Sequence, residues 1–370
     1  MRSLLIVRLS ALGDAIHVLP ALRALRETHP SAKIGWAIED RAASLLRGQP
    51  DLDRVHVVPR KQWTAWLRGG SWRRFLAGAR GLMSELRRER YEVALDFQSN
   101  LRSSLVALLS GAPRRIGQPR PYAKEGSGLW FTERPDPVPT EAHKIVRNLA
   151  LLEPLGVRPA SPPRGRLALP EAPSLRAALA AGRRPRAVLH AGVSAFGALK
   201  AWREERFARL GAALAGDGCE VLFAWGGARE RAQAERLAAA APGARVAPAT
   251  ASLLELAVLL GESDLFVGVD SGPLHLAAML GTPVLGLYGP KHPGTYGPFW
   301  PEGRVVRADE PCSPCRHRRC PRPDAAWQEA GGARLRISPC MDALSVEAAL
   351  AAARELLARA LPSEGPPSSA

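Results

Sequence analysis

The chain has 370 residues, of which 46% are hydrophobic and 23% charged, and its formal net charge is +16. This length favours two domains with separate cores. No apolar run approaches the roughly 20 residues that span a bilayer, which excludes a membrane-spanning protein. The amino-terminal run over residues 1–8 is too short and too soon interrupted by charge for a secretory signal. We therefore expect a cytoplasmic protein.

The positive charge is concentrated in residues 1–160, which hold 26 Lys and Arg against 15 Asp and Glu. It is densest over residues 60–90, where nine basic and two acidic residues are interleaved with three Trp and one Phe. Such a segment suits anionic lipid headgroups, a phosphorylated substrate or nucleic acid. An ordinary solvated helix face is the plainer interpretation. No nucleic-acid-binding motif accompanies the charge, so we expect an anionic membrane surface and a membrane-embedded, phosphorylated acceptor.

Strand and helix patterns alternate through the first half of the chain. The expected strands are residues 4–9, 34–38, 55–58 and 93–96. A loop over residues 10–14 leads from the first strand into a helix that runs to about residue 28. Residues 151–187 are rich in Pro, Arg and Ala, which is typical of a linker, with one short helix near residues 174–181.

A second alternation begins near residue 186. The expected strands are residues 187–190, 220–225, 265–269 and 283–288. The expected helices are residues 204–216, 229–240, 253–261 and 346–360. Strands that alternate with helices indicate parallel sheets with ligands at the carboxyl ends of the strands. We predict an α/β protein with two facing Rossmann-like domains, residues 1–165 and 186–345, a carboxyl-terminal helix over 346–361 and a disordered tail over 362–370.

The most informative stretch, residues 268–290, reads as strand end, tight loop, helix and strand. Asp270 or Ser271 can cap the helix, and Gly272 lets the first helical N–H groups approach a phosphate closely. Asp270 and His275 flank the helix start, and a turn with no binding role does not need both polar side chains. A capped helix with a solvated histidine is the alternative.

Four motifs, in order across both halves, resemble those of the bacterial ADP-heptose:lipopolysaccharide heptosyltransferases. They are residues 7–22, residues 190–202, residues 225–230 and residues 268–290. The resemblance implies the GT-B fold and inverting transfer of a heptose from ADP-heptose to the lipopolysaccharide inner core. It also implies a lipid A–Kdo type acceptor and a place on the inner face of the inner membrane.

The same resemblance implies roles for individual residues. Asp14 is implied to be the general base, and Lys200 to hold the donor phosphates and stabilise the leaving group, so that catalysis needs no metal. The other implied donor contacts are Gly192, Ser194, Glu230, Asp270, Ser271, Gly272 and His275. The implied acceptor contacts are Gly13, His17, Arg60, Lys61, Gln98 and Arg102. Without the resemblance, Asp14 and Glu230 fit ordinary helix starts, and Lys200 fits a solvated loop.

Four of the five cysteines cluster as Cys312-x2-Cys315-x4-Cys320, followed after nineteen residues by Cys340. Four thiolates at this spacing in a cytoplasmic protein favour a structural zinc ion. Reduced thiols, disulfides and an iron–sulfur centre are the alternatives. The best-known heptosyltransferases lack this cluster, so the resemblance does not decide among them.

Rival functions follow from the same features. Another sugar-nucleotide glycosyltransferase or an epimerase would use the same fold, and a basic binding protein without catalytic activity would retain it. The sequence does not decide which sugar moves, which acceptor hydroxyl attacks, or the oligomeric state.

Overall fold

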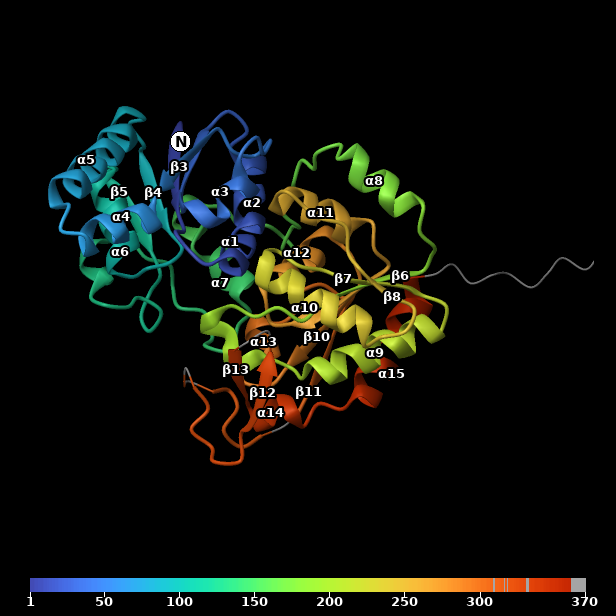
Figure 1. Cartoon of the computed structure of the whole chain (residues 1–370). Coiled ribbons are helices and arrows are strands. Elements are labelled where there is room, and N and C mark those ends of the chain that lie inside the picture. Colours follow the sequence, from blue (N-terminus) through green and yellow to red (C-terminus); the bar gives the residue numbers. More distant parts are fainter. Residues whose placement is uncertain (309, 316, 318, 331–332, 361–370) are drawn as a thin grey trace, which may run out of the picture. The chain divides into compact units, whose positions relative to one another are not determined.

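The computed structural model describes residues 1–308, 310–315, 317, 319–330 and 333–360, and Figure 1 labels their helices and strands. The chain divides into two compact units, one of Met1–Ala168 with Ser252–Leu254 and the other of Leu169–Ala251 with Glu255–Ala370. The tail over residues 362–370 lies outside the described residues. Among those described, no helix is long and apolar enough to cross a membrane.

The first unit is built on a parallel sheet with the strand order β3-β2-β1-β4-β5. Its strands are β1 (Ser3–Val7), β2 (Lys33–Glu39), β3 (Arg54–Val58), β4 (Val93–Asp96) and β5 (Arg114–Gly117). Its helices are α1 (Leu12–Ile16), α2 (Leu19–Thr28), α3 (Asp40–Leu46), α4 (Arg60–Arg68), α5 (Trp72–Arg88), α6 (Leu101–Leu109), η1 (Ser127–Trp130), α7 (Lys144–Ala150) and η2 (Glu153–Leu155). The chain order reverses between β1 and β4, where a doubly wound sheet places its ligand.

The second unit has a six-stranded parallel sheet in the order β11-β10-β9-β6-β7-β8. Its strands are β6 (Arg186–His190), β7 (Glu220–Phe223), β8 (Ala244–Val246), β9 (Leu265–Val269), β10 (Val284–Tyr288) and β11 (Gly303–Arg307), with a separate antiparallel hairpin of β12 (Ala326–Ala330) and β13 (Ala333–Ile337). Its helices are α8 (Pro173–Ala180), η3 (Ala195–Lys200), α9 (Glu204–Gly216), α10 (Ala228–Ala239), α11 (Leu253–Gly261), α12 (Gly272–Leu280), α13 (Pro293–Tyr296), α14 (Pro339–Asp342) and α15 (Val346–Ala360). In this sheet the chain order of the strands reverses between β6 and β9.

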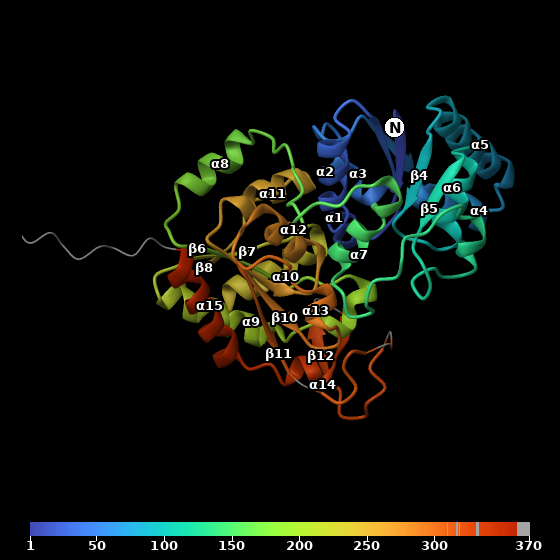
Figure 2. The ribbon, with the colours of Figure 1, turned by 180° about the vertical axis from the view of Figure 1, so that it is seen from behind.

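Both sheets carry buried helices, as the α/β prediction requires. In the first unit, Leu82 and Leu86 of α5 pack with Leu5 and Val7 of β1. In the second unit, α9, α10 and α15 lie on one face of the sheet (Figures 1 and 2) and bury their apolar sides in one core with the strands. The inner strands β1, β9 and β10 are buried along their whole length, because helices cover them.

Several boundaries differ from the sequence prediction. The helix expected to run to residue 28 is two helices, α1 and α2, and the first strand ends at Val7 instead of residue 9. The predicted bounds of β4, β9, α9, α11 and α15 agree with the structure. The sequence prediction missed the short strands β5, β8 and β11, the β12–β13 hairpin and α7.

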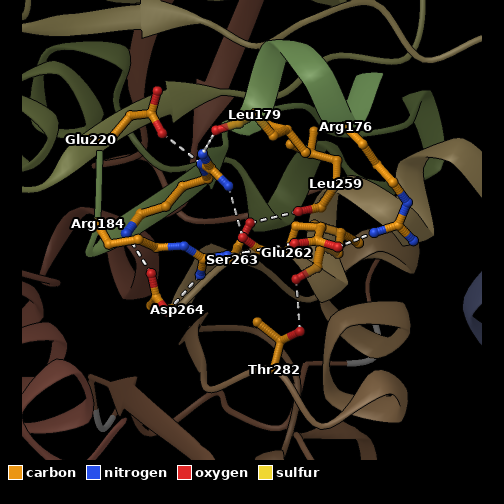
Figure 3. A network of polar contacts seen from close by, with 11 residues as sticks. Arg176, Leu179, Arg184, Glu220, Leu259, Glu262, Ser263, Asp264 and Thr282 are labelled. Atoms are coloured by element: carbon orange, nitrogen blue, oxygen red, sulfur yellow. Dashed lines mark hydrogen bonds and ion pairs between the residues drawn. The ribbon is translucent and has the colours of Figure 1, made fainter. Parts of the chain in front are cut away.

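A buried ion pair fixes the start of the second sheet. The guanidinium Nε of Arg186 lies 2.6 Å from Glu220 Oε2, and both side chains are almost fully buried. Arg186 also donates to the carbonyl oxygens of Leu179 and Glu262. Figure 3 shows Asp264 and Glu262 beside Arg184 and Arg176, which continue this network to α8. The network ties α8 to the amino ends of the strands, opposite the edge where ligands are expected.

Candidate active site

In the first unit, the carboxylate of Asp14 lies between two cations, just beyond the end of β1. Arg8 Nη2 is 2.5 Å from Asp14 Oδ2, and the ammonium of Lys144, the first residue of α7, donates to Oδ1. Burial alone would raise the pKa of Asp14, but the charges of Arg8 and Lys144 outweigh it and hold the pKa well below its usual range. The N-cap of α1 is Ala11, and Asp14 is the third residue of the helix, where its Oδ2 accepts from the Ala11 N–H at 3.5 Å.

Gln98 and His17 support the loop that carries Asp14. Gln98 Oε1 accepts hydrogen bonds from the backbone N–H groups of Leu9 (3.0 Å) and Ser10 (3.2 Å). His17 is buried, and its ring meets His143 edge-on at 5.5 Å between centroids. These contacts fix the backbone on both sides of Asp14, and Gly13 lies within this same turn as part of α1.

The expected acceptor cations gather around a carboxylate that the sequence analysis missed. Glu39, the buried last residue of β2, has its Oε2 3.2 Å from Arg60 Nη1 and its Oε1 3.8 Å from Arg102 Nη1. Lys61 is exposed on α4. Arg60 and Arg102 therefore lie together at the carboxyl edge of the first sheet, partly neutralised by Glu39. The sequence did contain a signal for Glu39, because a charged residue at the end of an apolar strand is unusual.

In the second unit, Lys200, Asp270 and His275 form one cluster at the switch point between β6 and β9. Lys200 Nζ lies 2.6 Å from Asp270 Oδ2 and also donates to the Asp270 carbonyl oxygen at 3.2 Å. His275 Nε2 lies 3.1 Å from Asp270 Oδ1. Burial alone would raise the pKa of Asp270, but the hydrogen bond with His275 and the charge of Lys200 lower it to about 2. The cluster is thus an ionised carboxylate that orients a lysine and a histidine.

The start of α12 borders this cluster. Ser271 is the N-cap with extended backbone, Gly272 is the first helical residue, and Gly281 ends the helix with a φ of 87°. The Ser271 hydroxyl is buried and has no hydrogen-bond partner in the part of the chain that the structure describes. A helix N-terminus beside a lysine favours an anion.

Glu230, at the start of α10, contacts residues at the carboxyl ends of β6 and β7. Its Oε2 accepts from the Gly226 N–H at 2.8 Å and lies 3.5 Å from His190 Nε2. The hydrogen bond with His190 lowers the pKa of Glu230, although partial burial opposes it. A Cβ on Gly192 would lie 2.8 Å from His190 Nε2 and 2.9 Å from Glu230 Oε1, so a larger residue here would displace these side chains. The sequence analysis missed His190 as a site residue, and Ser194 lies exposed before η3.

The cysteines of the predicted metal cluster come from two segments that meet at Gly289 and Pro290. The Cys315 N–H donates to the Pro290 carbonyl at 2.7 Å, and a Cβ on Gly289 would lie 2.9 Å from Cys340 Sγ. Burial raises the pKa of the Cys340 thiol, a hydrogen bond with Ser338 lowers it, and the thiols of Cys312, Cys320 and Cys315 are near enough to raise it further.

All five cysteines are free thiols. Among the described residues, no three His, Cys, Asp or Glu side chains are arranged to hold a metal ion. The structure therefore brings the two cysteine segments together without forming a closed coordination shell.

The aromatic residues of the basic segment are mostly engaged within it. Trp63 meets Phe75 edge-on at 5.5 Å between centroids, and Trp63 and Trp66 cover Gly78 so closely that a Cβ there would lie 3.0 and 3.2 Å from them. These contacts hold α4 and α5 together. Trp72, at the start of α5, is instead 59% exposed.

Two doubly wound sheets, one with a lysine and a helix N-terminus at its switch point, define the GT-B class of glycosyltransferases. The model of glycosyltransferase family 9 (heptosyltransferase) matches residues 79–326. The chain belongs to this family and is a glycosyltransferase.

Individual relatives agree with this membership. The chain is 32% identical to lipopolysaccharide heptosyltransferase 1 of Pseudomonas aeruginosa, over 85% of this chain and 86% of that protein. It is similar to the structure of the Escherichia coli heptosyltransferase WaaC with ADP, with a TM-score of 0.68 and 25% identity over 83% of this chain and 93% of that one. The structure of WaaC with ADP-2-deoxy-2-fluoro heptose gives a TM-score of 0.67, with the same identity and coverage.

Proposed function

We propose that this glycosyltransferase moves a heptose from ADP-heptose to the inner core of lipopolysaccharide, with a lipid A–Kdo type acceptor. The observation that carries the proposal is the cluster of Lys200, Asp270 and His275 at the start of α12. The similarity to WaaC, whose structures hold ADP and an ADP-heptose analogue, supports ADP-heptose as the donor.

The donor half of the reaction needs positive charge where the diphosphate leaves. Lys200 and the N–H groups at the start of α12 supply it, while Asp270 keeps the ammonium in place. Such prearranged charge stabilises a leaving group without a metal ion, so we expect no catalytic metal. Gly192, Ser194 and Glu230 lie near the same strand ends, where Glu230 can accept hydrogen bonds from the ribose hydroxyls.

The acceptor half needs a group that takes the proton of the attacking hydroxyl. We assign this role to Asp14, which its two cationic neighbours keep ionised. A general base must be within hydrogen-bond distance of the proton it takes. The acceptor hydroxyl would therefore share Asp14 Oδ1 with the Lys144 ammonium or replace it there.

The acceptor itself is anionic, and Arg60, Lys61 and Arg102 are the cations that we expect to bind it. Glu39 already offsets the charges of Arg60 and Arg102. An anionic acceptor group would replace that partner more readily than a neutral one. We propose that the protein works in the cytoplasm, attached to the inner face of the inner membrane.

We also propose that Cys312, Cys315, Cys320 and Cys340 bind one structural zinc ion. The support is their spacing in the sequence and the meeting of their two segments at Gly289. Tetrahedral thiolate sites of this kind stabilise the fold. The side chains would have to turn toward one another on binding.

The proposed function is tested by measuring ADP release from ADP-heptose, ADP-glucose and UDP-sugars in the presence of a lipid A–Kdo acceptor. We expect acceptor-dependent release from ADP-heptose that exceeds release from the other donors. Faster turnover of another donor would contradict the choice of sugar. Isomerisation of the donor sugar without acceptor, followed by NMR, would instead support the epimerase alternative.

A further inference from the structure

Helix α6 buries polar side chains and exposes apolar ones, the reverse of an ordinary surface helix. Its buried side carries Ser103 and Ser104, whose hydroxyls donate to Oδ2 of the buried Asp96 at 2.8 and 2.9 Å. Its outer side carries three leucines at spacings of four and three residues, which place them on one helix face. They are 47%, 42% and 36% exposed at Leu101, Leu105 and Leu108, respectively.

A fourth exposed leucine lies on η1, the element that packs against α6. This residue, Leu129, is 87% exposed. The loop before η1 is held to the start of α6, because Glu125 accepts from the Leu101 N–H at 3.2 Å and the Ser127 hydroxyl donates to the Ser99 carbonyl at 2.8 Å. We call Leu101, Leu105, Leu108 and Leu129 the leucine face. Exposed large apolar side chains gathered on neighbouring elements mark an interaction surface.

Arginines lie at both ends of the helix that carries most of the leucine face. Arg102 lies on α6 itself, and Arg87 of α5 reaches the other end of the helix, where its Nε donates to the Leu109 carbonyl at 3.1 Å. Residues 101–134 contain six Lys and Arg against two Glu, of which Glu133 is paired with Arg114. A second copy of the chain would bring the same positive charge to this surface. An anionic bilayer instead offers acyl chains to the leucines and phosphates to the cations.

We propose that the leucine face inserts into the interface of an anionic membrane, with the surrounding Arg and Lys side chains on the headgroups. The face begins at Leu101, next to Arg102 and the carboxyl edge of the first sheet. An enzyme docked in this way would take a lipid-linked acceptor directly from the bilayer surface. This last point rests on the proposed function, whereas membrane insertion does not.

The experiment measures co-sedimentation with phosphatidylethanolamine–phosphatidylglycerol vesicles at about 0.1 M and 1 M salt, because salt screens charge contacts and leaves apolar insertion intact. The test variant replaces the four leucines with glutamine, which has a similar helix propensity. Trp327→Gln is the matched control, since Trp327 is 56% exposed and belongs to the second unit. A second variant, L105Q alone, guards against a folding defect in the fourfold variant, and thermal melting checks both.

We expect wild-type protein and W327Q to keep a salt-resistant fraction of binding, and the fourfold variant to lose it by at least about tenfold. L105Q should lose part of it. Reversing Arg73, Arg74, Arg87 and Arg88 to Glu should instead remove the salt-sensitive fraction.

Unchanged binding of a folded fourfold variant at high salt would overturn the proposal. Equal binding to phosphatidylcholine vesicles would overturn the anionic preference. If the wild-type protein is a dimer and the fourfold variant is a monomer, the leucine face binds a second copy of the chain and the membrane proposal is wrong. If the vesicle results hold but ADP-heptose is not turned over, the proposed function fails and the membrane surface stands.

Discussion

Replacing Lys200 with methionine removes the charge that we assign to the donor phosphates while keeping most of the side-chain volume. Lys200 is partly exposed, and its ammonium is 2.6 Å from Asp270 Oδ2. A hydrogen bond to a charged group contributes about 1.5–3 kcal/mol. At 1.4 kcal/mol per factor of ten, Lys200→Met should weaken ADP binding by roughly ten- to a hundredfold.

Isothermal titration calorimetry with ADP measures this change directly. Lys291→Met is the matched control, because Lys291 follows the neighbouring strand β10 and its Nζ contacts the Cys315 carbonyl at 3.4 Å. The pKa of Asp270 is about 2, so in the wild-type protein this carboxylate stays ionised from pH 5 to 9 and keeps its ion pair with Lys200. Since this pKa is lowered on folding, Asp270 stabilises the fold above its unfolded value of about 3.9, and the stabilisation is lost as the pH falls toward 2. ADP affinity of Lys200→Met equal to that of Lys291→Met would refute the reasoning.

Two further predictions concern stability. Glu220→Gln breaks the buried pair with Arg186 and should lower the free energy of unfolding by about 3–5 kcal/mol in urea denaturation. Asp217→Asn, which breaks the exposed pair with Arg354, should lower the free energy of unfolding by about 1 kcal/mol or less. Equal losses of unfolding free energy in the two variants would contradict the difference expected between the buried and the exposed pair. Protein purified without chelator should contain about one zinc ion per chain, which Cys340→Ser should abolish. If the protein contains no metal and chelation does not change its melting temperature, the four cysteines are reduced thiols and the zinc proposal is wrong.

The sequence predicted the positions of Asp14, Lys200, Asp270 and His275 at strand ends because parallel sheets place polar residues in the loops that follow the strands. It did not predict the partners of Asp14. Lys144 lies 130 residues further along the chain, and its helix α7 has only seven residues. Contacts of that separation depend on how elements pack, which local patterns do not encode.

The missed strands β5 and β8 have a different cause. Both are short and lie at sheet edges, and both begin near arginines where a buried strand would have aliphatic residues. In α6, a periodicity argument would bury Leu101, Leu105 and Leu108. The structure buries the serines instead, because the buried carboxylate of Asp96 needs hydrogen-bond donors.

The central claim, that Asp14 is the general base of a glycosyl transfer, is tested most directly by the turnover of Asp14→Asn with ADP-heptose and a lipid A–Kdo acceptor. Asparagine keeps the shape but cannot take the proton. Because Asn also breaks the pairs with Arg8 and Lys144, a lower melting temperature is expected, and Lys144→Met is the control that breaks one pair but keeps the carboxylate. We predict that kcat of Asp14→Asn falls by at least about 100-fold with unchanged ADP affinity, while Lys144→Met stays within about tenfold of wild type. Turnover of Asp14→Asn above about a tenth of wild type would contradict the assignment.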